Sequence, residues 1–76
     1  MLKEHEIVVL NEDISDHDLK KDDVGAVVAV YDKGKGYEVE FVTYKGDTIA
    51  VVTLLPYQVR PIAAKEMMTV RNLVNV

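Results

Sequence analysis

The stretch YEVEFV, residues 37–42, decides the fold class. Its side chains alternate, because Tyr37, Val39 and Phe41 are separated by Glu38, Glu40 and Val42. A period of two residues places each set of side chains on its own face of an extended strand. The stretch therefore predicts a strand with one buried and one solvated face, and Tyr37 is expected in the core.

Four further strands are predicted on either side of this stretch. Val24–Tyr31 and Thr48–Leu54 are largely apolar and rich in valine, which is typical of strands covered on both faces. Ile7–Leu10 is a shorter first strand and Gln58–Ile62 is a short last one. Because Pro61 lacks an N–H, the last strand is expected at a sheet edge or to end there.

The short connections have the composition of turns. Asp32–Gly36 and Tyr44–Asp47 contain glycines that can take a positive φ, and both predict tight hairpins. Gly46 is the expected left-handed residue of the second hairpin. Leu55–Tyr57 is short and predicts a single 3₁₀ turn before the last strand.

The first connection, Asn11–Asp23, is a long polar loop whose aliphatic anchors are Ile14 and Leu19. We expect these two side chains to plug one end of the fold while the carboxylates stay in water. Five short strands, a long first loop, two tight hairpins and a 3₁₀ turn predict an all-β, five-stranded SH3-like barrel over residues 1–62. Residues 63–76 are left as a C-terminal extension.

The C-terminal extension has a mixed pattern. Its first half is rich in Ala, Met, Lys and Glu, which favour helix, and its second half is rich in valine, which favours strand. We expect a short turn or helix that leads into an added strand. Such a strand would pair with a sheet edge of this chain or of a second copy in a homo-oligomer. Its candidate oligomerisation residues are Met68, Val70, Val74 and Val76.

Composition argues against an enzyme. The chain has 76 residues, 49% of them hydrophobic and 29% charged, which fits one small globular domain without a second core. It contains no cysteine, so a disulfide, a thiol nucleophile and a Cys-ligated zinc site are excluded. Ser15 has no glycine elbow around it, and the carboxylates that flank His17 do not have calcium-loop spacing. We expect no catalytic residues, no metal and no cofactor.

Negative charge is concentrated in the first half of the chain. Residues 1–32 carry nine acidic and three basic side chains, residues 33–76 carry six basic and four acidic ones, and the net charge is −4. An acidic chain repels phosphate backbones, which disfavours nucleic acid as a partner. The N-terminus lacks a signal-peptide pattern, and the longest apolar run is far shorter than the ~20 residues of a membrane span. We expect a cytoplasmic protein with no membrane partner.

Six segments between His5 and Ile62 match a known family, and they are Ile7–Leu10, Leu19–Val28, Tyr37–Val42, Gly46–Thr48, Val52–Leu54 and Val59–Pro61. Through these segments the stretch resembles a small bacterial family, domain of unknown function 4926. The resemblance implies an SH3-like barrel, often encoded as a small stand-alone protein, and it supplies no mechanism. Asp22 departs from the family, which often has glycine at this place. The run Asp23-Val24-Gly25-x-Val27 is also similar to the loop and strand of KOW-type barrels in ribosomal and transcription proteins.

The predicted function is a protein-interaction module with a basic protein partner. Acidic patches steer a protein toward basic partners, and SH3 grooves place aromatic side chains between the first loop and the 3₁₀ turn. An antitoxin or immunity role, in which the chain neutralises a basic toxin, is one concrete version. The candidate protein-binding residues are Asp13, Asp16, Asp18, Asp22, Tyr44 and Tyr57.

Two alternatives stay open. A KOW-like nucleic-acid-binding protein would use the basic side chains of the hairpins and the last strand, and its two hairpin tips would lie near each other. A self-assembling subunit, or an accessory subunit of an enzyme, would use the C-terminal extension. The basic residues of the first alternative are Lys33, Lys35, Lys45 and Arg60.

Overall fold

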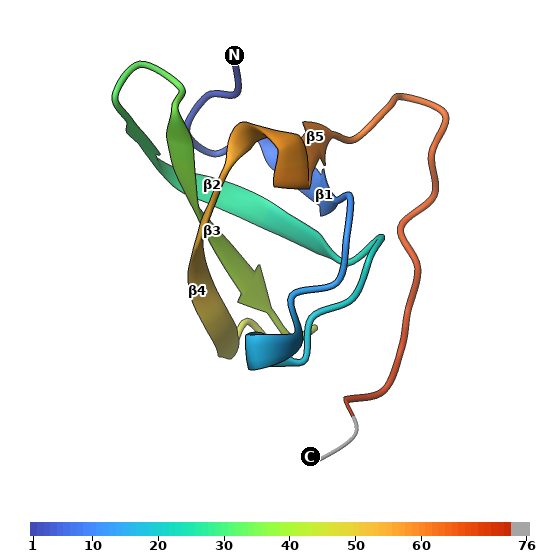
Figure 1. Cartoon of the computed structure of the whole chain (residues 1–76). Coiled ribbons are helices and arrows are strands. Elements are labelled where there is room, and N and C mark those ends of the chain that lie inside the picture. Colours follow the sequence, from blue (N-terminus) through green and yellow to red (C-terminus); the bar gives the residue numbers. More distant parts are fainter. Residues whose placement is uncertain (74–76) are drawn as a thin grey trace.

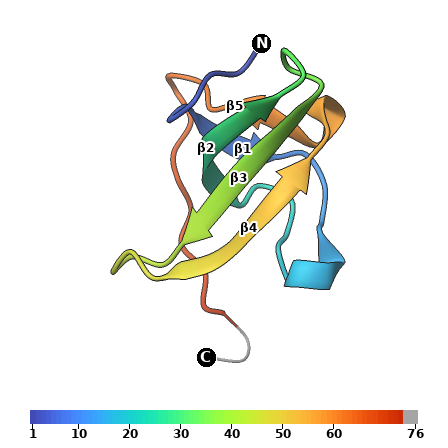
Figure 2. The same cartoon turned by 90° about the vertical axis from the view of Figure 1, so that its left-hand side faces the viewer.

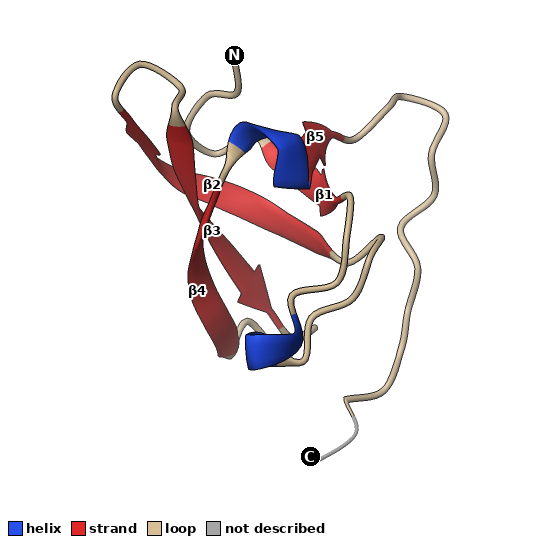
Figure 3. Cartoon of the chain, viewed as in Figure 1, coloured by secondary structure: helices blue, strands red, loops and turns tan. Residues whose placement is uncertain are grey.

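The computed structural model describes residues 1–73 and shows an all-β chain with one sheet of five antiparallel strands (Figures 1 and 3). The described residues contain no α-helix, only two 3₁₀ turns, and no helix long and apolar enough to cross a bilayer. The elements are β1 (Ile7–Leu10), η1 (Ser15–His17), β2 (Val24–Tyr31), β3 (Gly36–Val42), β4 (Thr48–Leu54), η2 (Pro56–Gln58) and β5 (Val59–Pro61).

The strands follow the order β4-β3-β2-β1-β5, so β4 and β5 are the two ends of the hydrogen-bonded sheet. The short β5 lies at an edge and ends at Pro61, as the missing N–H of proline requires. The sheet is strongly twisted and curls around one side, as Figure 2 shows. A bulge in the β2–β3 ladder at Val28 sharpens this bend.

The predicted strands and turns are confirmed almost residue by residue. Four of the expected strands have their predicted bounds or differ by one residue, and the last is shorter by one residue at each end. Gly34 and Gly46 take φ values of +98° and +90° in the two hairpins, where a side chain would strain the backbone. The 3₁₀ turn follows Leu55 directly, which is where the sequence predicts it.

The concave face of the sheet carries the hydrophobic core. No polar or charged side chain is buried in the described residues, and the five most deeply buried large side chains are Leu10, Leu54, Val8, Val27 and Val39. Tyr37 is 3% exposed, which confirms its expected place in the core. Its hydroxyl accepts a hydrogen bond of 3.2 Å from the backbone N–H of Leu2, which is itself a core residue that the sequence pattern did not reveal.

The outer face of the sheet is less well covered than the sequence predicts. Val28 in β2 is 40% exposed and Val51 in β4 is 48% exposed, so the expectation that these strands are buried on both faces is wrong. The β1–β2 ladder pairs Ile7 with Ala26 and Val9 with Val24, and these side chains share the outer face near the start of β2. The C-terminal extension passes over the start of β2, where Met68 and Val70 line a pocket together with Val24 and Ala26.

The C-terminal extension differs from the prediction. Within residues 63–73 there is a turn after Ala63 but neither a helix nor a strand, so the expected added strand is absent from the described part. Met68 and Val70 are 56% and 96% exposed and lie on no sheet edge. Figure 1 shows this segment passing beside the sheet as an irregular arch. Val74 and Val76, the other two predicted oligomerisation residues, lie outside the described residues.

Candidate protein-binding site

The acidic first loop is ordered by its own hydrogen bonds. The carboxylate of Asp13 accepts a bond of 2.8 Å from the N–H of Lys21, and that of Asp23 accepts one of 2.8 Å from the N–H of Lys20. Leu19 is 2% exposed and forms a bridge with the half-buried Ile14, which confirms that these two residues anchor the loop. The loop therefore presents its charges from a fixed backbone.

The four predicted acidic residues of the site are all exposed. Asp16 belongs to η1, and Asp18 ends this turn with a φ of +56°. Asp22 also has a positive φ, of +76°, which Asp and Asn accept more readily than most residues. Asp13 lies nearer the start of the loop and is exposed as well. The ion pairs within residues 1–73 use none of these four carboxylates.

The two predicted tyrosines are not brought together. Tyr57 is 65% exposed in η2, and its carbonyl accepts a hydrogen bond of 3.0 Å from the Asn11 side chain, so the beginning of the acidic loop contacts η2. Tyr44 is fully exposed in the hairpin before β4, whereas η2 follows β4. The hairpin that carries Tyr44 and the turn η2 that carries Tyr57 thus lie at opposite ends of β4 (Figure 2), which argues against one shared aromatic groove.

The acidic loop holds an arginine of the C-terminal extension. The Arg71 guanidinium donates from Nε to Asp23 Oδ1 at 2.8 Å and from Nη2 to Asp23 Oδ2 at 2.6 Å. Nη2 also donates to the backbone carbonyl of Asp18 at 3.0 Å. We call the Asp23 carboxylate and the Asp18 carbonyl the clasp. This two-pronged pairing joins residues 48 positions apart and fixes the extension to the loop.

The pairing in the clasp shifts the pKa values of both Asp23 and Arg71. Partial burial works to raise the pKa of the Asp23 carboxyl, but hydrogen bonds from Arg71 and from the Lys20 N–H outweigh it and hold the pKa below its ordinary value. The hydrogen bond to Asp23 raises the pKa of Arg71. Both groups are therefore charged at neutral pH, and the attraction between them is fully present there.

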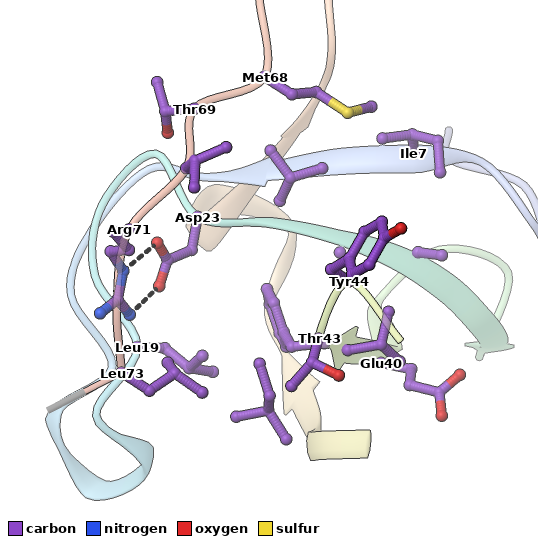
Figure 4. Close-up of a pocket in the computed structure, with 17 residues that line it drawn as sticks. Ile7, Leu19, Asp23, Glu40, Thr43, Tyr44, Met68, Thr69, Arg71 and Leu73 are labelled. Carbon is purple, nitrogen blue, oxygen red and sulfur yellow. Dashed lines mark hydrogen bonds and ion pairs between the residues drawn. The ribbon is translucent and has the colours of Figure 1, made fainter. Parts of the chain in front are cut away.

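A pocket of about 580 Å³ lies between the extension and the sheet, beside the clasp. Figure 4 shows Arg71 and Asp23 at one end of it and Tyr44 toward the other. Its walls are mainly apolar and come from the start of β2, the end of β3 and the extension. Residues of these three parts include Val24, Ala26, Phe41, Val42, Met68 and Val70.

The basic residues proposed for nucleic acid do not form one surface. Lys33 and Lys35 lie in the hairpin before β3, and Lys45 lies in the hairpin after it, so the expectation that the two tips are close is wrong. Seven extended residues separate the hairpins, which corresponds to roughly 20 Å at about 3.3 Å per residue. The Arg60 guanidinium is paired in two-pronged fashion with Glu66, at 2.6 and 2.7 Å.

The outer-face carboxylates of β3 are bound to neighbouring strands. Glu38 accepts hydrogen bonds of 2.8 Å from the Tyr31 hydroxyl and from the Thr53 hydroxyl. The first of these bonds raises the pKa of Tyr31. Glu40 accepts one of 2.8 Å from Thr48. Both glutamates thus act as cross-strand links on the outer face, and within residues 1–73 no three His, Asp or Glu side chains converge on a possible metal position.

Sequence reasoning missed the clasp because it treated the acidic loop and the extension as separate surfaces. Arg71 is a single basic residue in the mixed run Val70-Arg71-Asn72-Leu73, and nothing in this run indicates which distant residue it pairs with. Asp23 is one of several carboxylates in the loop sequence, and nothing local distinguishes it from the others. Its side chain is 16% exposed, which distinguishes it from the exposed carboxylates around it.

Comparison with known proteins identifies the family and no activity. The family model described as Domain of unknown function (DUF4926) matches residues 4–61, about three quarters of the chain, and the chain belongs to this family. No curated protein and no solved structure matches it. The matched segment covers the sheet and the acidic loop and ends before the extension that carries Arg71.

Proposed function

We propose that this member of the family is a non-enzymatic protein-binding module that docks a basic surface of another protein on its acidic first loop. The observation that carries the proposal is the exposure of Asp13, Asp16, Asp18 and Asp22 on a loop whose backbone is fixed by hydrogen bonds. Fixed charges complement a partner without the entropic cost of ordering a loop. Neutralisation of a basic toxin is one version of this function.

A charge-matched pair of variants tests the proposal. The loop variant carries Asp16→Asn, Asp18→Asn and Asp22→Asn, and it retains Asp13, whose carboxylate accepts the Lys21 N–H. The control variant loses the same charge elsewhere, through Glu4→Gln, Asp32→Asn and Asp47→Asn, all of them exposed. Asparagine accepts the positive φ of Asp18 and Asp22, so the loop should keep its backbone.

The immobilised chain is incubated with a lysate of the cells that encode it, and bound proteins are quantified for the wild type and both variants. We expect a basic protein that the wild type and the control retain, that the loop variant loses, and whose binding weakens with salt. Capture that is equal for the loop variant and the control would contradict a loop-directed function, as would the absence of any protein with a basic surface.

A further inference from the structure

The clasp is built to receive a guanidinium, and every acceptor in it belongs to the loop. The Lys20 N–H holds the Asp23 carboxylate, which offers both of its oxygens to Arg71. The Asp18 carbonyl is set by the left-handed turn that ends η1 and by the burial of Leu19 beside it. All three acceptors thus have supporting contacts within the loop itself.

The geometry selects arginine over lysine. Nε and Nη2 donate to different oxygens of one carboxylate, and Nη2 also reaches a carbonyl from the preceding turn. A planar fork of donors matches this arrangement, whereas an ammonium group is a point charge that cannot reach both oxygens in the same way. The Asp18 carboxylate adds negative charge beside the clasp, which favours a cationic group there.

The extension fills the clasp but leaves the apolar pocket beside it open. Met68 and Val70 line the pocket, yet they remain 56% and 96% exposed. On the sheet side, Ile7 is 36% and Val42 is 48% exposed, and Tyr44 at the rim is fully exposed. The outer face thus keeps an apolar surface next to an arginine site, and the extension covers only part of it (Figure 4).

We propose that the clasp and the adjoining pocket bind an extended segment of a partner protein that carries an arginine with apolar neighbours, and that Arg71 occupies this site until the partner displaces it. This inference rests on the proposed function and names the feature of the basic partner that is recognised. Charge complementarity selects the arginine, and the open pocket takes the apolar neighbours. The extension, with Val70 and Leu73 around Arg71, is the chain's own and less well fitted version of such a segment.

The test uses the full chain and a fluorescein-labelled peptide with the sequence of residues 66–73, EMMTVRNL. Fluorescence polarisation measures its affinity for the wild type and for the Arg71→Ala variant. We expect the variant, whose clasp is empty, to bind at least about tenfold more tightly than the wild type, whose own Arg71 competes. An Arg71→Lys peptide should bind more weakly, and an Arg71→Ala peptide weaker still.

A second protein variant isolates the carboxylate. In the Arg71→Ala background, Asp23→Asn removes the charge but keeps an oxygen for the Lys20 N–H, so the loop should stay folded, which circular dichroism checks. We expect peptide affinity to fall by about tenfold or more, because a bond to a charged partner is lost. The loop variant of the previous section retains Asp23 and the Asp18 carbonyl and should still bind the peptide. The peptide experiment and the lysate experiment can therefore give different outcomes, so this inference and the proposed function are tested separately.

Three results would overturn the inference. The first is equal peptide affinity for the wild type and Arg71→Ala, or no binding to either. The second is binding that Asp23→Asn or the Arg71→Ala peptide leaves unchanged. The third is a wild-type dimer in sedimentation that Arg71→Ala converts to a monomer, which would assign the clasp to the extension of a second copy.

Discussion

The sheet and the C-terminal extension are held to the molecule by different kinds of interaction. The sheet is stabilised by apolar burial on its inner face, with no buried polar side chain in the described residues. The extension is held by two arginine–carboxylate pairs, Arg60–Glu66 near its start and Arg71–Asp23 near its end. The difference means that charge can control the extension without controlling the fold.

The largest expected effect is on the core, and two adjacent leucines measure it. Leu54 is 1% exposed and Leu55 is 48% exposed. Leu54→Ala should lower the free energy of unfolding by about 2–5 kcal/mol, since it leaves a cavity among packed side chains. Leu55→Ala should change it by less than about 0.5 kcal/mol. Urea denaturation followed by circular dichroism checks both values, and similar losses for the two variants would contradict the assignment of the core.

A smaller loss is expected from Gly25→Ala in β2. A Cβ at this position would lie 2.7 Å from Val39 Cγ1 and 2.9 Å from both the Glu40 carbonyl oxygen and a Phe41 ring carbon. The crowding should destabilise the fold by about 1–3 kcal/mol. Gly36→Ala is the matched control, because its nearest neighbour would be 3.8 Å away. Thermal unfolding of both variants should show a clear fall in Tm for Gly25→Ala alone.

The fold was largely predictable and the clasp was not, for a physical reason. Alternation in Tyr37–Val42 and the turn glycines are local signals, and they specify strands because each depends on neighbouring residues. The pairing of Arg71 with Asp23 depends on where the folded loop places one carboxylate, 48 residues away. Leu2 is a similar case, since its backbone N–H donates a hydrogen bond to the hydroxyl of Tyr37, which is 35 residues away.

The outer face of β2 is apolar, as the sequence predicts, but the expectation that it is fully covered is wrong. The error concerned how complete the cover is, because the extension crosses the start of β2 and leaves Val28 exposed. A run of valines indicates only that a face of the strand is apolar. Whether another segment covers this face depends on segments whose position cannot be predicted from the local sequence.

The third prediction concerns Arg71→Ala, which should affect the extension and spare the fold. The pair lies at the surface, with the Arg71 side chain 30% exposed, and the entropic cost of ordering this long side chain offsets part of the attraction. We expect the free energy of unfolding to fall by less than about 1 kcal/mol. Urea denaturation with Arg71→Lys as the conservative variant checks this value. A loss as large as that of Leu54→Ala would show that the extension is part of the core.

The smallest effect is the response to acid. The hydrogen bond from Arg60, together with the Ala63 N–H, lowers the pKa of Glu66 from 4.5 to about 2. The pKa of Asp23 also lies below its ordinary value of 3.8. Both carboxyls have a lower pKa in the folded chain than in the unfolded chain. The two ion pairs, Arg60–Glu66 and Arg71–Asp23, therefore contribute fully to stability above the ordinary pKa values. This contribution is lost as the pH falls through the pKa values of the folded chain.

A titration from pH 7 to pH 2, followed by the amide signals of residues 63–73, checks this expectation. The amide signals of the extension should stay constant through pH 4.5 and move only at lower pH, toward the Glu66 pKa of about 2 and the lowered pKa of Asp23. If the signals finish moving above pH 5, neither carboxylate can be responsible for the change. This result would contradict the claim that the Arg60–Glu66 and Arg71–Asp23 pairs hold the extension.

The most direct test of the account is ¹⁵N relaxation of the amides in residues 63–73, compared between the wild type and Arg71→Ala. The account predicts order parameters near those of the sheet around Arg71 in the wild type. In the variant it predicts values below about 0.6 there and unchanged values in β1 to β5. Equal values for the extension in both proteins, or loss of order in the strands as well, would contradict a clasp that holds the extension without holding the fold.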